Sequence, residues 1–162
     1  MKNGTACFFR EGNGTLFLYR HDGKEDLHNG FYVLPGGTIE RGEIGLENII
    51  REFKEETGWE LINPKLKVIW TCYNKGRLLG GKTDQEDWLV QVYTANQAKG
   101  ILKAEAGKNA EPRWVFDSAM REIKMYPGDR ELLKILDKEG IFEAIQQYDG
   151  ERLIRFNSKR VD

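Results

Sequence analysis

Cysteine and histidine are scarce in this chain, and their scarcity narrows the kinds of site it can build. The two cysteines, Cys7 and Cys72, lie far apart and form no C-x-x-C pair. We therefore expect two free thiols in a reducing compartment rather than a disulfide. The two histidines are His21 and His28, so a histidine-rich zinc site is not expected.

A strong charge imbalance and a long apolar run are also missing. The net charge is −1 and the pI about 6.2, so no broad field favours nucleic acid or an anionic membrane, whereas a local phosphate-binding site is still compatible. No signal-peptide h-region and no apolar run of ~18 residues is present, which predicts a cytoplasmic protein. Without repeats or an interdomain linker, residues 1–162 are expected to form one domain that buries roughly 70% of its unfolded surface.

The stretch from Gly37 to Trp59 carries the most informative pattern. Its apolar residues recur at helical spacing and predict an amphipathic helix with one buried stripe. This stripe comprises Leu46, Ile49, Ile50 and Phe53. Three glutamates at i, i+3 and i+4 share the neighbouring face: Glu52, Glu55 and Glu56. Gly58 is typical of a left-handed helix end. From the spacing of the glutamates alone, they are either a solvated helix face or ligands of a hard cation such as Mg²⁺.

The fixed positions of this stretch resemble the Nudix box, G-x5-E-x7-R-E-U-x-E-E-x-G-U, where U is hydrophobic. Every fixed letter is present: Gly37, Glu43, Arg51, Glu52, Phe53, Glu55, Glu56, Gly58 and Trp59. The last of these is bulkier than the usual aliphatic residue. The resemblance implies an α/β fold, the Nudix α/β/α sandwich with a mixed β-sheet. It also implies a hydrolase that acts on phosphoanhydrides with Mg²⁺, or alternatively Mn²⁺.

Roles for individual residues follow from the same resemblance. It implies that Glu52, Glu55 and Glu56 bind the metal, together with a carbonyl of Gly36 or Gly37. Arg51 is expected to pair with Glu43 and to orient the loop that precedes the helix. From the residues alone, the Pro35-Gly36-Gly37 segment is a tight bend that lets backbone approach a ligand closely.

The flanking segments predict strands. Residues 5–10 and 15–20 form an expected hairpin, and Arg20 at its end is either a solvated edge residue or a contact to substrate phosphate. Residues 31–34, 64–74 and 86–95 are further expected strands.

The stretch 96–112 is expected to be a loop. It contains Glu105 and Glu111, and the resemblance implies that one of them is a further metal ligand or the general base; Glu111 is favoured because it adjoins a strand. Either could instead be a solvated acid.

The C-terminal part predicts a strand at 113–116, a helix over 130–139 capped by Asp129, a second helical run reaching Tyr148, and a closing strand at 151–156. This order predicts a sheet with the box helix on one face and the C-terminal helices on the other.

A finer resemblance concerns residues 125–129. Met125-Tyr126-Pro127-Gly128-Asp129 is similar to the Met-Trp-Pro-Asp-Asp segment of MutT-related enzymes that hydrolyse oxidised purine nucleoside triphosphates. In those enzymes the aromatic residue stacks on the base and the acids bind its edge, which implies substrate contacts for Tyr126 and Asp129. Three departures stand out: tyrosine replaces tryptophan, Gly128 replaces the first acid, and Val33 stands where those enzymes carry an amide.

The leading hypothesis is a pyrophosphohydrolase of purine nucleoside triphosphates, with 8-oxo-dGTP as the expected substrate, that sanitises the nucleotide pool as a monomer or homodimer. A nucleotide sugar, ADP-ribose or a pyrimidine triphosphate is the alternative substrate. A non-catalytic nucleotide sensor is a third reading, which the retained glutamates disfavour. Processing of RNA ends is disfavoured because no concentrated basic stripe is present.

Overall fold

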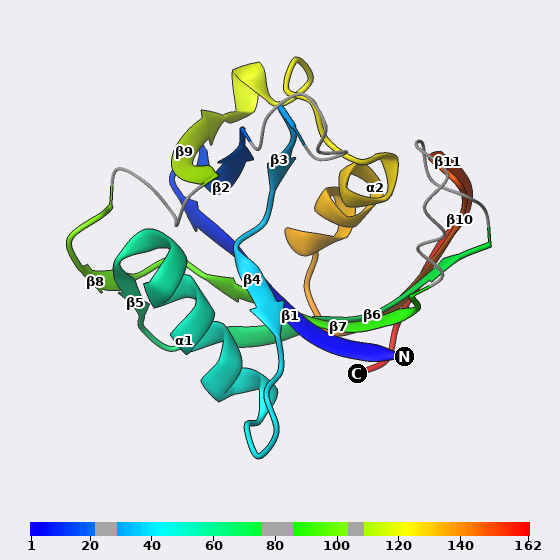
Figure 1. Ribbon diagram of the computed structural model, residues 1–162, viewed down its shortest axis with the longest axis horizontal. Coiled ribbons are helices and arrows are strands. Elements are labelled where there is room, and N and C mark those ends of the chain that lie inside the picture. Colours follow the sequence, from blue (N-terminus) through cyan, green and yellow to red (C-terminus); the bar gives the residue numbers. More distant parts are fainter. Residues whose placement is uncertain (22–28, 76–85, 104–108) are drawn as a thin grey trace.

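The computed structural model describes residues 1–21, 29–75, 86–103 and 109–162. It places a mixed β-sheet between two helices (Figure 1). The elements, in chain order, are β1 (Lys2–Glu11), β2 (Gly14–Arg20), β3 (Tyr32–Val33), β4 (Gly36–Thr38), α1 (Gly45–Thr57), β5 (Trp59–Leu61), β6 (Lys65–Asn74), β7 (Trp88–Ala95), β8 (Ala98–Gly100), β9 (Ala110–Phe116), the short 3₁₀ turn η1 (Asp117–Ala119), α2 (Pro127–Leu136), β10 (Phe142–Asp149) and β11 (Arg152–Arg160).

Within the described ranges, nine strands form one sheet in the order β11-β10-β6-β7-β1-β2-β3, with β4 paired to β1 and β9 paired to β2. The pairs β1–β7 and β6–β10 are parallel and the others are antiparallel. The prediction of a mixed sheet with helices on both faces is therefore confirmed. Strands β5 and β8 form a separate two-stranded ribbon beside α1.

Helix α1 covers one face of the sheet through its predicted stripe. Ile49 and Phe53 are fully buried and pack against Phe9 and Leu16 of the β1–β2 hairpin. Leu46 is 40% exposed, so the stripe is narrower than expected. The helix stops at Gly58, whose φ of 83° is the left-handed conformation predicted for that position.

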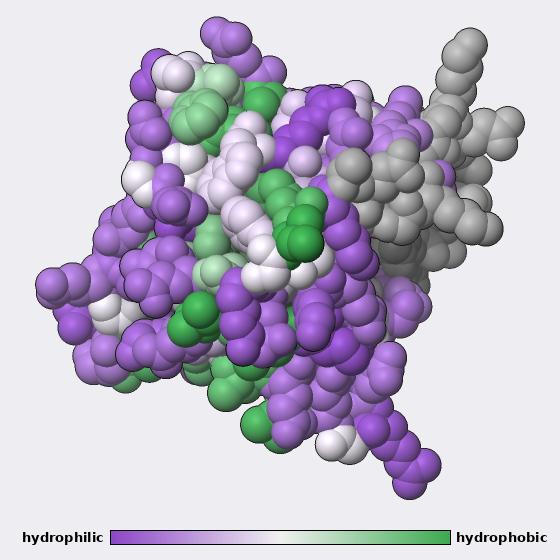
Figure 2. All heavy atoms as spheres, turned by 90° about the vertical axis from the view of Figure 1, so that its left-hand side faces the viewer, coloured by the Kyte–Doolittle hydropathy of each residue, from purple (hydrophilic) through white to green (hydrophobic). Residues whose placement is uncertain are grey.

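The exposed side of the molecule near α1, β5 and β8 is largely polar. Figure 2 shows hydrophilic residues over most of this face, with smaller groups of apolar residues between them. In the part of the chain that is described, neither helix is long and apolar enough to cross a membrane.

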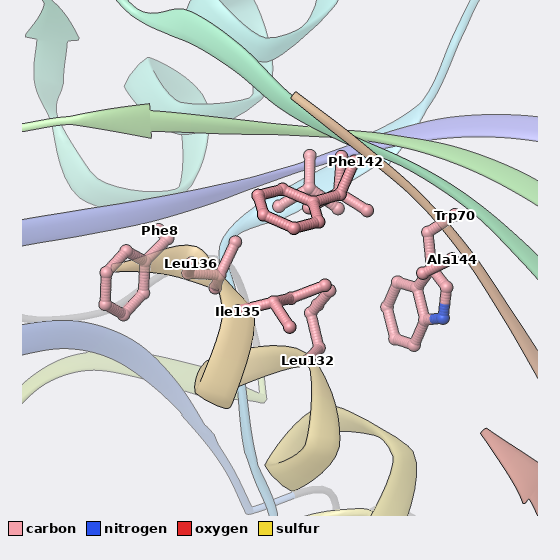
Figure 3. Packing of buried hydrophobic residues seen from close by; sticks show 9 residues of the cluster. Phe8, Trp70, Leu132, Ile135, Leu136, Phe142 and Ala144 are labelled. Atoms are coloured by element: carbon pink, nitrogen blue, oxygen red, sulfur yellow. The ribbon is translucent and has the colours of Figure 1, made fainter. Parts of the chain in front are cut away.

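Helix α2 covers the opposite face of the sheet. Its buried residues pack on side chains from β1, β6 and β10 (Figure 3). The helical residues are Leu132, Ile135 and Leu136, and the strand residues include Phe8, Val68, Trp70, Phe142 and Ala144. Successive residues of β1 therefore pack alternately against α1 and α2, because side chains alternate between the two faces of a strand.

Two expectations for the C-terminal part are wrong. Helix α2 begins at Pro127 after Tyr126, so Asp129 is the third helical residue and not the cap. Proline suits the first helical position because its missing N–H would have no partner there. The helical run predicted to reach Tyr148 is instead strand β10, which buries the alternating residues Phe142, Ala144 and Gln146 against the α2 layer and pairs in parallel with β6. Tertiary pairing overrode local propensity here.

Candidate active site

The Pro35-Gly36-Gly37 bend leads into β4, which pairs with β1 and lies against α1. A Cβ at Gly36 would come within 2.0 Å of the Thr5 carbonyl oxygen, and one at Gly37 within 2.4 Å of the Glu52 carboxyl carbon. At Gly36 the Cβ would collide with the backbone of Thr5 and Ala6, so no side chain fits, whereas at Gly37 it would displace the Glu52 carboxylate. The two glycines therefore allow bare backbone to lie beside the carboxylates of α1.

The place where α1 meets β4 is called the corner below. Glu56 of α1 contacts the Gly36 backbone there. Its Oε2 accepts a hydrogen bond from the Gly36 N–H at 2.8 Å. Burial raises the pKa of Glu56 to about 8; the Gly36 N–H opposes the rise, the charges of Glu52 and Glu55 add to it, and Arg20 opposes it. Glu55, by contrast, is 59% exposed. The Gly36 N–H and the charge of Arg20 therefore do not offset the cost of burying the ionised Glu56 carboxylate.

Arg51 links the other carboxylates. Its Nε and Nη2 donate to the two oxygens of Glu43 at 2.8 and 3.1 Å, and its Nη1 donates to Glu52 at 2.9 Å and to Glu55 at 3.3 Å. The Arg51 guanidinium holds the pKa of Glu43 at about 2, and the pKa of Arg51 itself is raised. The expected Arg51–Glu43 pair is therefore present, and it is bidentate.

Asn48 is a part of this corner that the sequence reading missed. It is fully buried, and its Nδ2 donates both to Glu43 and to the Thr38 carbonyl, each at 2.8 Å. Its Oδ1 accepts from the Thr5 hydroxyl. Asn48 thus ties β1, β4 and the loop before α1 together. Its position four residues before Glu52, beside the buried stripe, was the available signal.

No three Asp, Glu, His or Cys side chains converge as a ready metal cluster within the described residues. The donors nevertheless fit a hard divalent cation. Glu52 lies against Gly37, Glu56 is largely buried and accepts a hydrogen bond from the Gly36 N–H, and the carboxylates and nearby carbonyls offer oxygen atoms as ligands. A cation beside Glu56 would favour its ionised form and would supply the charge compensation that the corner lacks.

Arg20 and Val33 lie on adjacent strands. Arg20 ends β2 and, by alternation along the strand, lies on the same side as Leu16, which packs beneath α1; its charge opposes the rise in the pKa of Glu56. Val33 is half-buried in β3 and pairs with Leu18. Of the two, only Arg20 is connected to the glutamates by a described interaction.

Glu111 lies in β9 and not in a loop. It faces Tyr19 across the β2–β9 pair, and its carboxylate accepts from Arg113 Nε at 2.5 Å. The Arg113 guanidinium in turn lies 3.8 Å over the Tyr19 ring. Because Tyr19 and Arg20 point to opposite faces of β2, the structure does not bring Glu111 to the face that holds Glu56. Glu105 lies outside the described residues.

Tyr126 and Asp129 lie at the start of α2, on the other face of the sheet. The Tyr126 ring stacks on Phe31 with ring centroids 4.4 Å apart and planes tilted by 22°. Burial raises the pKa of the Asp129 carboxyl to about 7. The charge of Asp129 adds to the burial that raises the pKa values of Cys72 and Tyr148, so these three groups lie close together.

An α/β sandwich in which a glutamate-rich helix lies against a glycine bend defines a protein of the Nudix class. The NUDIX domain family model matches residues 2–136, and the chain belongs to this family of hydrolases. It is 31% identical over 150 residues to a protein named uncharacterized Nudix hydrolase YvcI, from Bacillus subtilis; the match covers 91% of this chain and 87% of that one.

Two further comparisons are more limited. The fold is shared with a MutT protein from Bacillus halodurans at a TM-score of 0.80, with 24% identity and 98% of each chain covered. An ADP-ribose pyrophosphatase from Methanocaldococcus jannaschii is 41% identical over 51 residues, which is 32% of this chain and 28% of that one. The family follows from the domain match and the relative from B. subtilis, whereas the MutT structure shows a shared fold.

Proposed function

We propose that this chain is a Mg²⁺-dependent pyrophosphohydrolase that converts a nucleoside triphosphate to the monophosphate and pyrophosphate. The observation that carries the proposal is the corner between α1 and β4. There Glu56, buried and with a raised pKa, lies with Glu52 beside two glycines that expose their backbone. Such a corner suits a cation that also contacts phosphate oxygens.

The chain's own groups divide the work in this proposal. Glu52, Glu55, Glu56 and the carbonyls of Gly36 or Gly37 hold Mg²⁺. When bound, Mg²⁺ neutralises charge on the phosphates and polarises the bond to be cleaved. Arg51 holds Glu52 and Glu55 in register through its bidentate anchor on Glu43, and Arg20 binds a substrate phosphate from the end of β2.

Hydrolysis also needs a group that takes a proton from the attacking water while the phosphoanhydride bond breaks and pyrophosphate leaves. Glu105 and Glu111 are the proposed candidates for this base. Glu111 pairs with Arg113 on the strand face opposite Arg20. This arrangement disfavours Glu111, and Glu105 is the other candidate, outside the described residues.

For the base of the substrate, we favour an oxidised purine, with 8-oxo-dGTP as the substrate. Tyr126 and Phe31 present stacked aromatic rings at the start of α2, and Asp129 lies three residues after Tyr126 with a carboxyl that can either accept or donate a hydrogen bond near neutral pH. ADP-ribose is the second candidate, because 51 residues of this chain are 41% identical to the ADP-ribose pyrophosphatase from M. jannaschii. The proposed enzyme is cytoplasmic and a monomer or homodimer.

The test is a turnover screen of oxidised and normal purine triphosphates, pyrimidine triphosphates, ADP-ribose and nucleotide sugars, each with Mg²⁺ and with Mn²⁺. We expect the highest kcat/KM for an oxidised purine. Glu56→Gln should lower kcat by about 10²-fold or more, with folding preserved because glutamine can still accept the Gly36 hydrogen bond.

Glu139→Gln, which changes an exposed glutamate after α2, is the matched control and should behave as wild type. Unchanged turnover in Glu56→Gln would refute the metal assignment. A preference for ADP-ribose over every purine triphosphate would replace the substrate proposal.

A further inference from the structure

Asn48 is a buried polar residue within the glutamate-bearing helix α1. It is fully buried, like the apolar residues Ile49 and Phe53 of the same helix. Asparagine is a poorer helix former than alanine, and burying its amide is costly unless the amide is hydrogen-bonded. Neither helix formation nor apolar packing therefore accounts for an asparagine here, and the account must come from its hydrogen bonds.

The Asn48 amide uses both of its donors and its acceptor. Its Nδ2 donates to the Thr38 carbonyl oxygen and to Glu43 Oε2, each at 2.8 Å, and its Oδ1 accepts from the Thr5 hydroxyl. The orientation of the amide follows from this chemistry, because a carbonyl and an ionised carboxylate can only accept and must face the NH₂ group. Asparagine therefore suits a position that needs two donors and one acceptor on a short side chain.

One of these bonds fixes the carboxylate that holds Arg51. Glu43 Oε2 accepts from Asn48 Nδ2 at 2.8 Å, from the Glu40 N–H at 3.1 Å and from Arg51 Nη2 at 3.1 Å, while its Oε1 accepts from Arg51 Nε at 2.8 Å. Glu43 lies in the loop before α1, whereas Asn48 lies on the helix, three residues before Arg51. A donor on the rigid helix therefore sets the rotation of the Glu43 carboxylate so that both of its oxygens face Arg51.

The other two bonds hold the Asn48 amide itself in place beside the glycine bend. Thr5 faces Gly37 across the β1–β4 pair, and Thr38 is the next residue of β4. The carboxylate of Glu52, one helical turn after Asn48, lies against Gly37. The amide is thus anchored on β1 and β4 at the place where Glu52 meets the bend, and its remaining N–H is directed at Glu43.

We propose that Asn48 is a positioning residue for the divalent cation: it orients Glu43, Glu43 orients Arg51, and Arg51 holds the Glu52 carboxylate, to which its Nη1 donates at 2.9 Å. Asn48 itself contacts neither the cation nor the substrate. This inference rests on the proposed Mg²⁺-dependent hydrolase activity of the same corner. The competing explanation is a purely structural role, in which Asn48 stabilises the fold and leaves the affinity for the cation unchanged.

Titration of the full chain with Mn²⁺ in the absence of nucleotide separates the two explanations, because it requires no turnover. Asn48→Ala should raise the Kd for Mn²⁺ by about tenfold, and Asn48→Ser, a second truncation that keeps a hydroxyl for the buried partners, should raise it in the same direction. Ile49→Val is the matched control at the neighbouring buried position. It should lower the Tm by about 2–6 °C and leave the Kd for Mn²⁺ unchanged.

A double variant tests the route through Arg51. In the Arg51→Met background, Asn48→Ala should change the Kd for Mn²⁺ by less than about twofold, because the guanidinium through which Asn48 acts is then missing. Two residues that acted independently would instead show the same tenfold effect of Asn48→Ala in both backgrounds.

The outcomes distinguish this inference from the proposed function. A wild-type chain that does not bind Mn²⁺ overturns the metal assignment and this inference together. Wild-type binding that Asn48→Ala and Asn48→Ser leave unchanged, even with a lower Tm, overturns the role of Asn48 alone and leaves the proposed function standing. An equal effect of Asn48→Ala with and without Arg51 overturns the proposed route from Asn48 to Glu52.

Discussion

Asp129→Asn should make the protein more stable at alkaline pH and a poorer enzyme. A flexible aspartate ionises near pH 4, whereas burial raises the pKa of Asp129 to about 7. The folded state therefore favours the protonated acid. The favourable contribution of Asp129 is fully present below about pH 4 and is lost as the pH rises through about 7. Asparagine carries no charge, so the variant does not lose stability in this range.

The size of the effect follows from the two pKa values. A difference of about three pH units corresponds to ~4 kcal/mol for a group that water cannot reach. The Asp129 side chain is partly exposed, and a carboxylate in the first turn of α2 gains ~0.5 kcal/mol from the helix dipole, which asparagine forgoes. We therefore expect a net advantage of about 2 kcal/mol for the variant above pH 8, or about 4–8 °C in Tm for a chain of this size.

Thermal and urea denaturation of wild type and Asp129→Asn, at about pH 5 and about pH 8.5, measure this difference. The advantage of the variant should shrink to less than about 1 kcal/mol at the lower pH, because most of the wild-type acid is then protonated in the folded state. Asp149→Asn, at the exposed end of β10, removes the same charge and controls for net-charge effects. Asp129→Asn should also have a lower kcat/KM than wild type for the preferred purine.

A stability difference that is the same at both pH values would refute the reasoning, because it would mean that the Asp129 carboxyl ionises normally in the folded protein. A variant that is less stable at pH 8.5 than at pH 5, relative to wild type, would show that the carboxylate has stabilising partners.

Two further changes test the corner between α1 and β4. Gly37→Ala places a Cβ 2.4 Å from the Glu52 carboxyl carbon. We expect kcat/KM to fall by about tenfold or more and the required Mg²⁺ concentration to rise. Thr38→Ala, at the exposed next residue, should leave kcat/KM unchanged. Arg51→Met removes the bidentate bond to Glu43. It should raise the half-saturating Mg²⁺ concentration and lower kcat by about 10–100-fold. A lower Tm without any change in Mg²⁺ dependence would mean that Arg51 supports only the fold.

Local spacing was sufficient for much of the helix and its surroundings. The apolar stripe, the left-handed stop at Gly58, the Arg51–Glu43 pair and the glycines beside Glu52 all involve residues within about twenty positions of one another. Helical and turn geometry therefore fixes their relative places with little help from the rest of the chain. The pattern of fixed letters in this stretch also indicated the family.

Contacts between distant segments required the folded chain. Residues 142–149 became a strand because β6 offered them a parallel partner, and their helical appearance in sequence carried no information about that partner. Glu111 faces away from Glu56 because β9 pairs with β2 in one register, and a shift of one residue would have reversed its side. The role of Asn48 also depends on the fold, since its partners come from β1, from β4 and from the loop between β4 and α1.

The order of residues therefore determined the family, the glutamate-bearing helix and the backbone bend beside it, because each is a matter of short-range spacing. The packing of α2 on the sheet decided which polar groups meet at Gly128. The Asp129 carboxyl, the Gln146 oxygen and the Tyr148 hydroxyl come from two elements, and only burial at their contact raises the pKa of Asp129 and leaves the Gln146 oxygen without a partner in the described structure. Burial and strand register are properties of the whole fold, and no local pattern encodes them.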